Sequence, residues 1–130
     1  MKIFGIGTDI VNIVRMEKSL KRHGIKFKNN IFSKNEIAYC EKKKNSGAFY
    51  AKRFAAKEAL VKAIGTGFRK NLNFRDIQIF NDKLGKPYYS INPKIMRFIK
   101  EKKRVKNFNL FLSISDEKEY SIAFTIIQKI

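Results

Sequence analysis

Residues 53–67 have the sequence Arg-Phe-Ala-Ala-Lys-Glu-Ala-Leu-Val-Lys-Ala-Ile-Gly-Thr-Gly, and this stretch decides the fold. On a helix with 3.6 residues per turn, the apolar side chains of this region fall on two opposite faces. One face carries Phe49, Ala56, Leu60 and Ala63, and the other carries Phe54, Val61 and Gly65, flanked by Ala51 and Ala55. A helix that is apolar on two opposed faces is usually buried between layers. We therefore expect a long central helix that other elements cover on both sides.

Two charged residues interrupt the second apolar face of this helix. Glu58 lies in the middle of that face, and Lys62 lies one turn further along. An ion pair between them is the common explanation and adds a few tenths of a kcal/mol to helix stability. A carboxylate is rarely buried without a partner or a metal, and Arg53 and Lys57 project from the adjoining side as further cations.

The helix is predicted to end in Gly65-Thr66-Gly67. Gly65 or Gly67 can take the left-handed conformation that ends many helices. Glycine equally lets a ligand approach the backbone closely.

The size and composition indicate one domain spanning residues 1–130, with a core of its own. No apolar run is long enough to span a membrane, and the first residues begin a strand-like pattern without the cleavage region of a signal peptide. The single cysteine, Cys40, excludes an intrachain disulfide and a cysteine-rich metal site. We expect a cytoplasmic protein.

The net charge is +18, from 29 basic and 11 acidic residues. A field of this sign attracts polyanions, which include nucleic acid, an acidic protein, an anionic membrane surface and a phosphorylated small molecule. Charge alone does not choose among these partners.

The N-terminal stretch from Ile3 to Val11 has the alternation of a β-strand. The face with Phe4, Ile6, Thr8 and Ile10 is predicted to belong to the core. The other face carries Ile3, Gly5, Gly7 and Asp9. Glycines within a strand mark a close approach by a backbone or ligand. The face with Gly5 and Gly7 therefore has few side chains, and it ends in the Asp9 carboxylate. Taken alone, Asp9 is typical of a turn or cap.

Two helices are predicted before the central one. Asn12 caps the first, which we expect from Ile13 to about Arg22 with a basic outer face, and Gly24 lies just beyond its end. Ser33 and Glu36 form a capping box that starts the second, which runs to about Lys43.

The pattern changes period after Gly67. Residues 77–80 and 88–91 are predicted to pair as strands, Asn92 and Pro93 open a further helix, and residues 108–115 and 120–127 form the last antiparallel pair. We therefore expect an α+β fold in a single domain, with a small, mainly antiparallel sheet packed against the long central helix.

Three segments together resemble a known family. They are Gly5-Ile6-Gly7-Thr8-Asp9-Ile10-Val11, the central stretch from Arg53 to Gly67, and Gly85-Lys86-Pro87. Their order and spacing resemble the small trimeric holo-[acyl-carrier-protein] synthases of the 4′-phosphopantetheinyl transferase superfamily. The resemblance covers almost the whole chain and implies the fold of that family.

The resemblance also implies an activity. Members of this family move the 4′-phosphopantetheine arm of coenzyme A onto a serine of apo acyl carrier protein and release adenosine 3′,5′-bisphosphate, in support of fatty acid biosynthesis. By position, Asp9 and Glu58 would be the Mg²⁺ ligands. The expectation suits the ion, since Mg²⁺ prefers one or two carboxylates together with waters and substrate phosphates.

The remaining site residues follow from the same resemblance. Transfer of a phosphoryl group needs positive charge around it, and Lys62 is the first candidate for a pyrophosphate oxygen. Other expected coenzyme A contacts are Arg53, Lys57, Gly65, Thr66, Gly67, Lys86 and Pro87. Lys86 would meet the 3′-phosphate of the nucleotide. Arg15 and Arg22 would meet the acidic recognition helix of the carrier protein, and neighbouring subunits of a homotrimer would build each active site.

The sequence does not identify which group acts as the general base. Many relatives carry a histidine after the Ser-x-Ser of the penultimate strand, whereas Asp116 follows Ser113-Ile114-Ser115 here. The only histidine, His23, lies beside Gly24 and is expected at a surface helix end. Glu58 or a water on the metal remains as the acceptor of the serine proton.

Two other functions compete with the transferase. A nucleic-acid-binding module agrees with the charge and with aromatics among basic residues, namely Phe68, Phe74, Tyr88 and Tyr89. It leaves the placement of Asp9 and Glu58 unexplained. A metal-dependent phosphodiesterase would use both carboxylates but commonly has more ligands and often a second ion. We therefore favour the transferase, and we expect neither a nucleic acid nor a membrane as its partner.

Overall fold

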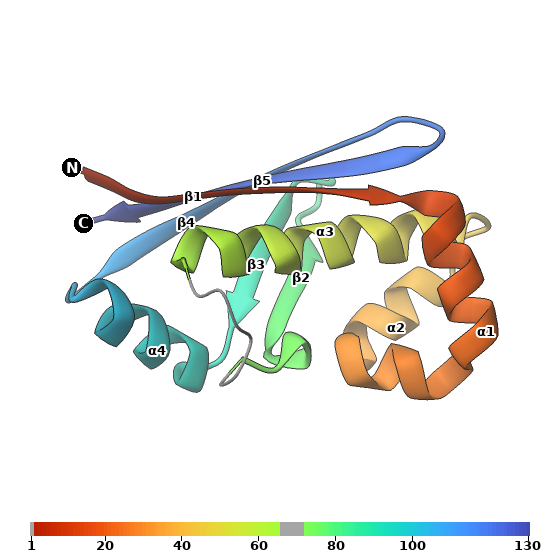
Figure 1. Ribbon diagram of the computed structural model, residues 1–130, viewed down its shortest axis with the longest axis horizontal. Coiled ribbons are helices and arrows are strands. Elements are labelled where there is room, and N and C mark those ends of the chain that lie inside the picture. Colours follow the sequence, from red (N-terminus) through yellow and green to blue (C-terminus); the bar gives the residue numbers. More distant parts are fainter. Residues whose placement is uncertain (1, 66–71) are drawn as a thin grey trace.

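The structure is a computed structural model that describes residues 2–65 and 72–130 (Figure 1). Its elements in chain order are β1 (Lys2–Asn12), α1 (Ile13–Ile31), α2 (Lys34–Glu41), α3 (Ser46–Ile64), the short 3-10 helix η1 (Phe74–Asp76), β2 (Ile77–Asn81), β3 (Pro87–Ile91), α4 (Pro93–Lys103), β4 (Phe108–Asp116) and β5 (Tyr120–Lys129). Each predicted helix and strand is confirmed, with differences at some ends.

The strands form two antiparallel sheets around α3. β1, β5 and β4 form a three-stranded sheet in that order, and β2 pairs with β3 in a separate hairpin. α3 runs along the three-stranded sheet, with α1 and α2 near one end of α3 and α4 near the other (Figure 1). The expected α+β architecture around a buried central helix is confirmed, except that the strands are divided between two sheets.

The contact between β1 and α3 is a close approach of two backbones. A Cβ atom added at Gly7 would lie 1.9 Å from the carbonyl oxygen of Ala59, and one added at Gly5 would lie 2.4 Å from that of Ala63. Both distances are far shorter than any real carbon–oxygen contact, so only glycine fits. The glycine face predicted to admit a backbone or a ligand therefore admits the backbone of α3.

The opposite face of β1 was predicted to be core, and this prediction is wrong for most of its length. Ile6 is 60% exposed and Ile10 is 58% exposed. On β5, Ile122 pairs with Ile10, and both Ile122 and Phe124 are also exposed. We call Ile6, Ile10, Phe111, Ile122 and Phe124 the outer sheet face. Strand alternation identified two faces correctly, but it could not tell that α3 would cover the one with glycines.

The first helix extends further than predicted. The Asn12 side chain accepts a hydrogen bond from the backbone N–H of Arg15 at 2.9 Å, which confirms the cap. Gly24 interrupts the helix with φ 61° and ψ −145°, and the chain then resumes helical turns to Ile31. This conformation suits glycine alone. The segment after the kink packs Phe27 and Ile31 against the core.

The capping box of α2 is confirmed, and its glutamate has a second function. The Glu36 carboxylate accepts from the backbone N–H of Ser33 at 3.0 Å and is almost fully buried. It also accepts from Lys57 Nζ at 2.7 Å and from the backbone N–H of Ile79 at 3.2 Å. One carboxylate thus joins α2, α3 and β2.

Lys57 was predicted to bind a phosphate, and the structure contradicts this. Its side chain has no solvent exposure, and Nζ donates to Glu36 and to the carbonyl oxygens of Phe74 at 2.6 Å and Ile77 at 2.5 Å. Three acceptors use all three donors of an ammonium group. Burial lowers the pKa of Lys57 to about 8, an effect that the Glu36 carboxylate opposes. The lysine is a structural cation of the core.

The ends of α3 and α4 agree with the sequence. Gly65 ends α3 in the left-handed conformation, with φ 85°. The Asn92 side chain caps α4, whose Ile95 and Ile99 are fully buried. Among residues 2–65 and 72–130, none of the helices combines the length and apolar character needed to cross a bilayer.

We predict that Gly7→Ala destabilises the protein by about 3 kcal/mol, at the upper end of the range for overpacking. The added methyl would meet the backbone of Ala59, which cannot swing aside. Gly47→Ala is the matched control, because a Cβ there would meet the flexible side chain of Glu17. Urea denaturation of both variants measures the difference, and equal losses would contradict the backbone contact.

We predict that Lys57→Met lowers stability by about 3–5 kcal/mol, because it leaves the buried Glu36 carboxylate without its nearest cation. Pairing it with Glu36→Gln should recover part of this loss, since the double variant removes both charges of this pair, and the buried Arg53, 4.0 Å from Glu36, keeps its bond to Asn81. Urea unfolding of both single variants and the double variant gives the coupling free energy. A fully stable Lys57→Met protein with weakened coenzyme A binding would restore the phosphate-binding hypothesis.

Candidate active site

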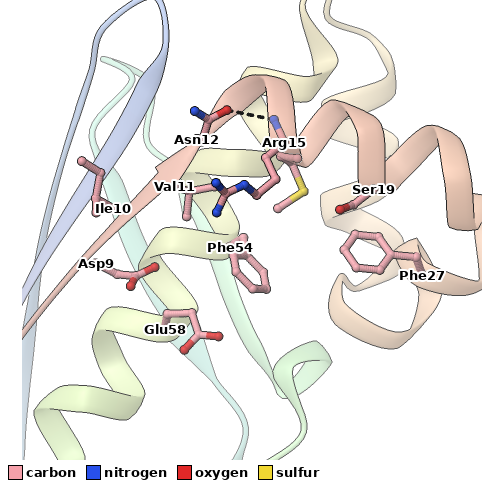
Figure 2. A pocket seen from close by; sticks show the side chains of 10 residues that line it. Asp9, Ile10, Val11, Asn12, Arg15, Ser19, Phe27, Phe54 and Glu58 are labelled. Carbon is pink, nitrogen blue, oxygen red and sulfur yellow. Dashed lines mark hydrogen bonds between the residues drawn. The ribbon is translucent and has the colours of Figure 1, made fainter.

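A cavity of about 480 Å³ opens between the end of β1, the start of α1 and the middle of α3 (Figure 2). Its lining residues are Asp9, Ile10, Val11, Asn12, Arg15, Met16, Ser19, Phe27, Phe54 and Glu58. Figure 2 shows Asp9 and Glu58 side by side at one end, whereas Ser19 and Phe27 lie at the other. The cavity therefore has two carboxylates at one end, and most of its other lining side chains are apolar.

Asp9 reaches the cavity because of the glycines that precede it. Gly5 and Gly7 hold β1 against α3, and Asp9 lies on the same face of the strand as these glycines. Lys62 Nζ donates to Asp9 Oδ1 at 3.0 Å and to the carbonyl oxygen of Thr8 at 3.0 Å. The Asp9 side chain is 17% exposed and that of Lys62 is 55% exposed, so this ion pair lies at the edge of solvent.

Glu58 comes to the same cavity from α3. It is half-buried, and the Phe54 ring lies one turn before it on the cavity wall. Lys62 lies one turn after it. Of the charged residues of this stretch, Glu58 and Lys62 therefore lie near Asp9, whereas Arg53 and Lys57 do not.

The two carboxylates fit an open Mg²⁺ site. Within the described part of the chain, no cluster of three or more His, Cys, Asp or Glu side chains is arranged to hold a metal ion. Mg²⁺ needs no such cluster, because it keeps several waters and takes one or two carboxylates plus substrate phosphates. Asp9 Oδ1 already has a cation, the Lys62 ammonium, as its partner. Hard oxygen ligands facing an open cavity suit this ion.

The two arginines expected to meet a carrier protein lie on α1. Arg15 lines the cavity, with its exposed side chain at the rim near Asp9 (Figure 2). Arg22 is exposed and lies seven residues later, almost two full turns, so both side chains are on one side of α1. His23 is also exposed, beside the Gly24 kink, as predicted.

Arg53 does not reach this cavity. Its side chain is almost completely buried, its guanidinium donates to Asn81 Oδ1 at 2.9 Å, and it stacks over the Tyr39 ring at 4.2 Å from the ring centroid. It lines a smaller second cavity of about 100 Å³ together with Phe49, Lys52, Ile79, Asn81, Gly85, Pro87, Ile114 and Asp116.

Of the remaining predicted contacts that the structure describes, Pro87 alone lines one of these two cavities. Pro87 lies at the second cavity, and the exposed Lys86 precedes it. Gly65 is exposed at the end of α3, and Thr66 and Gly67 lie outside the described residues. Glu58 follows Arg53 by five positions, which places the two side chains well apart around α3. A single chain therefore does not bring Lys86, Pro87 and Arg53 to the carboxylates.

Several site residues were missed by the sequence analysis. Phe27 and Ser19 line the main cavity, and Lys52 pairs with Asp116 at 3.5 Å beside the second one. Phe27 and Ile31, four residues apart after Gly24, carried a signal that the helix resumes. The Lys52–Asp116 pair joins α3 to β4, and no pattern in the sequence indicated that these two residues would pair.

The aromatic side chains that supported a nucleic-acid-binding module are partly used in packing. Phe74 is buried. The Tyr89 hydroxyl donates to the carbonyl oxygen of Ala56 at 2.6 Å, and its ring packs against the core. Tyr88 is half-exposed, and Phe68 lies outside the described residues. Two of the four aromatics that supported a nucleic-acid-binding module are therefore used in packing.

Comparisons with known proteins agree on one family. The model of the 4′-phosphopantetheinyl transferase superfamily matches residues 5–125. The chain is 55% identical over 129 residues to the holo-[acyl-carrier-protein] synthase of Pelagibacter ubique (strain HTCC1062), which covers 99% of both chains. It is 43% identical over 122 residues to that of Protochlamydia amoebophila (strain UWE25), which covers 94% of this chain and 95% of the relative.

Solved structures show the same similarity. The holo-[acyl-carrier-protein] synthase of Neisseria meningitidis matches with a TM-score of 0.87 at 38% identity, over 98% of this chain and 100% of the other. The enzyme of Bacillus anthracis, solved in complex with CoA (3′,5′-ADP), matches with a TM-score of 0.80 at 35% identity, over 98% of both chains.

Proposed function

The chain belongs to the 4′-phosphopantetheinyl transferase superfamily, among its holo-[acyl-carrier-protein] synthases, and on that premise we propose a mechanism for the Asp9–Glu58 cavity. In this cavity the 4′-phosphopantetheine group of coenzyme A is transferred to a serine of apo acyl carrier protein, in a Mg²⁺-dependent reaction. One observation carries the proposal. Two carboxylates from separate elements, Asp9 on β1 and Glu58 on α3, line one cavity beside the Lys62 ammonium.

Asp9 and Glu58 would hold the metal. When bound, Mg²⁺ would neutralise negative charge on the pyrophosphate of coenzyme A. Lys62 would then turn from Asp9 to a pyrophosphate oxygen, and its 55% exposed side chain leaves it free to do so. A fixed cation at that point stabilises the charge that moves during phosphoryl transfer.

The bonds exchanged define the reaction. The serine oxygen of the carrier protein forms a bond to the phosphorus next to the pantetheine, and the bond from that phosphorus to the bridging oxygen breaks. Adenosine 3′,5′-bisphosphate leaves with the electron pair. Glu58 is the group of this cavity suited to accept the serine proton, and Asp116 lies at the other cavity in a pair with Lys52.

A homotrimer would complete the site. The carboxylate cavity and the cavity with Arg53 and Pro87 share no lining residue, yet both belong to the expected coenzyme A contacts. Two half-sites on one chain can serve one ligand when copies associate head to tail in a closed ring. The apolar outer sheet face supports such an association, since large exposed apolar patches mark interaction sites. Lys86 of one subunit would then meet the 3′-phosphate.

The carrier protein would bind along α1. Arg15 lies at the rim of the cavity, and Arg22 lies further out on the same side of the helix. An acidic helix placed on these arginines would bring its serine to the carboxylate end. The modified carrier would serve fatty acid biosynthesis, and the cytoplasmic location expected from the sequence remains a prediction.

The proposal is tested by incubating the protein with coenzyme A, Mg²⁺ and an apo acyl carrier protein, followed by intact mass measurement of the carrier. We expect the carrier to gain one phosphopantetheine group and the nucleotide product to be adenosine 3′,5′-bisphosphate. EDTA should stop the reaction. An unmodified carrier in the presence of folded protein would refute the proposed transfer.

We predict that Asp9→Ala and Glu58→Ala each lower the transfer rate by at least about 100-fold, because each removes a metal ligand. Glu58→Gln should behave like the alanine change, since an amide is a poor ligand for a hard cation. Glu117→Ala, an exposed carboxylate in the β4–β5 turn, is the control. Thermal unfolding checks that the fold is kept. Near-wild-type activity at limiting Mg²⁺ would remove that residue from the metal site.

We predict that two inactive variants complement each other when their changes lie in different half-sites. Asp9→Ala and Lys86→Glu should each be poorly active at limiting coenzyme A. Refolded together at equal amounts, roughly a quarter of the sites would combine an intact Asp9 with a neighbour's intact Lys86. The control is a mixture of Asp9→Ala and Glu58→Ala, which share a half-site. No recovery in mixed oligomers proved by native mass spectrometry would contradict sites between subunits.

We predict that Arg15→Glu combined with Arg22→Glu raises KM for the carrier protein and leaves coenzyme A affinity almost unchanged. Cations at the rim of an interface mainly speed association with an acidic partner, so the wild-type reaction should also slow as salt rises. Lys42→Glu combined with Lys44→Glu changes the net charge equally at exposed positions away from the cavity. Equal carrier kinetics in both double variants would contradict a docking surface on α1.

A further inference from the structure

Lys103, the last residue of α4, holds its ammonium group against the end of the central helix. A Cβ atom built on Gly65 would lie 3.8 Å from Lys103 Nζ. Nζ also lies 6.0 Å from the centroid of the Phe4 ring on β1. The half-buried lysine thus reaches from α4 to the point where α3 ends and β1 passes.

The fold holds Lys103 in this place. Ile95 and Ile99 are fully buried, in the same core cluster as Leu60 and Ile64 near the end of α3. Arg104 then ends α4 in the left-handed conformation, with φ 55° and ψ 48°. It is the only non-glycine residue with positive φ among residues 2–65 and 72–130. Such conformations are unfavourable for arginine and tend to occur at functional sites.

Lys103 has no carboxylate partner among the described residues. Its own helix has one acid, Glu101, and further cations at Lys100 and Lys102. No hydrogen bond or ion pair joins Lys103 to any residue of the ranges 2–65 and 72–130. A half-buried ammonium group is more stable with an anion beside it.

The position of Lys103 continues the line of charged groups in the proposed site. Gly65 follows Glu58 by seven residues and Lys62 by three, so all three lie along one side of α3. Gly65 is exposed and has no side chain, which leaves room for a ligand at this end of the line. Lys62 on α3 and Lys103 on α4 are therefore two cations near the last turn of α3.

We propose that Lys103 is a further phosphate-binding residue, and that it donates to an oxygen of the coenzyme A pyrophosphate as this group passes Gly65. The inference rests on the proposed transferase function. It assigns α4 a part in substrate binding, besides its part in the core. The pyrophosphate is the part of coenzyme A expected at Lys103, because Lys62, the expected pyrophosphate ligand, lies about one helical turn before Gly65.

A structural function is the competing explanation. A cation near the C-terminal end of a helix is favourable, because the last carbonyl groups give that end a partial negative charge. In that case Lys103 would stabilise the end of α3 and would have no effect on ligand binding. Stability and affinity therefore have to be measured on the same variants.

The test compares Lys103→Met with Lys102→Met, which removes the same charge from the adjacent, exposed position. Dissociation constants are measured by calorimetry for coenzyme A and for 3′-dephospho-coenzyme A, which keeps the pyrophosphate. We expect Lys103→Met to weaken both ligands about 10-fold, the scale of a hydrogen bond to a charged group. Lys102→Met should have little effect. Lys103→Arg should keep most of the affinity, and Lys86→Met should weaken coenzyme A alone.

Wild-type protein supplies a second measurement. Acetic anhydride acetylates accessible lysines, and saturating coenzyme A should lower the acetylation of Lys103 several-fold while that of Lys102 stays unchanged. Equal affinities of Lys103→Met and Lys102→Met, with a lower melting temperature for Lys103→Met alone, would overturn the proposal in favour of the structural function. Failure of the wild type to bind coenzyme A would instead refute the transferase mechanism itself.

Discussion

The direct contact between the backbones of β1 and α3 is the constraint on which the rest of the structure depends. Gly5 and Gly7 allow the strand to lie against the carbonyl groups of Ala63 and Ala59, at distances that a methyl group would prevent. Since the two elements are in direct backbone contact, Asp9 on one is positioned beside the same cavity as Glu58 on the other. The proposed metal site, which takes only two protein ligands, needs such positioning, because each ligand must be in place before the ion arrives.

A buried ion pair performs the corresponding task on the other side of α3. Glu36 caps α2, receives the Lys57 ammonium and accepts from the Ile79 backbone, so that one carboxylate connects three elements. Although the chain carries a net charge of +18, the Lys57 side chain has no solvent exposure, and its ammonium donates to Glu36 and to two backbone carbonyl groups. Its neighbour Arg53 is also held inside, by Asn81 and Tyr39. Among Arg53, Lys57 and Lys62, only Lys62 is exposed enough to meet the phosphates of the proposed substrate.

The sequence by itself determined the local structure and the pair of carboxylates. Helix starts at Asn12, Ser33 and Asn92 were predictable, because a capping side chain bonds to a backbone group only a few residues away. The glycine that ends α3 and the strand pairs also follow from local rules. Glu58 stood out because charge there breaks an apolar pattern, whereas Asp9 alone was typical of a turn or cap and was paired with Glu58 through the resemblance to the family.

Only the tertiary structure decided which faces meet. Alternation along β1 defines two faces but does not show which of them is buried. Packing against α3 buries the glycine face and leaves Ile6 and Ile10 exposed. Likewise, Lys57 and Lys62 look alike in sequence, yet one is buried against Glu36 and the other is at the solvent edge beside Asp9. Partners 21 and 53 residues away make this difference. The physical reason is that the cost of burying a charge depends on distant groups that only the folded chain brings together.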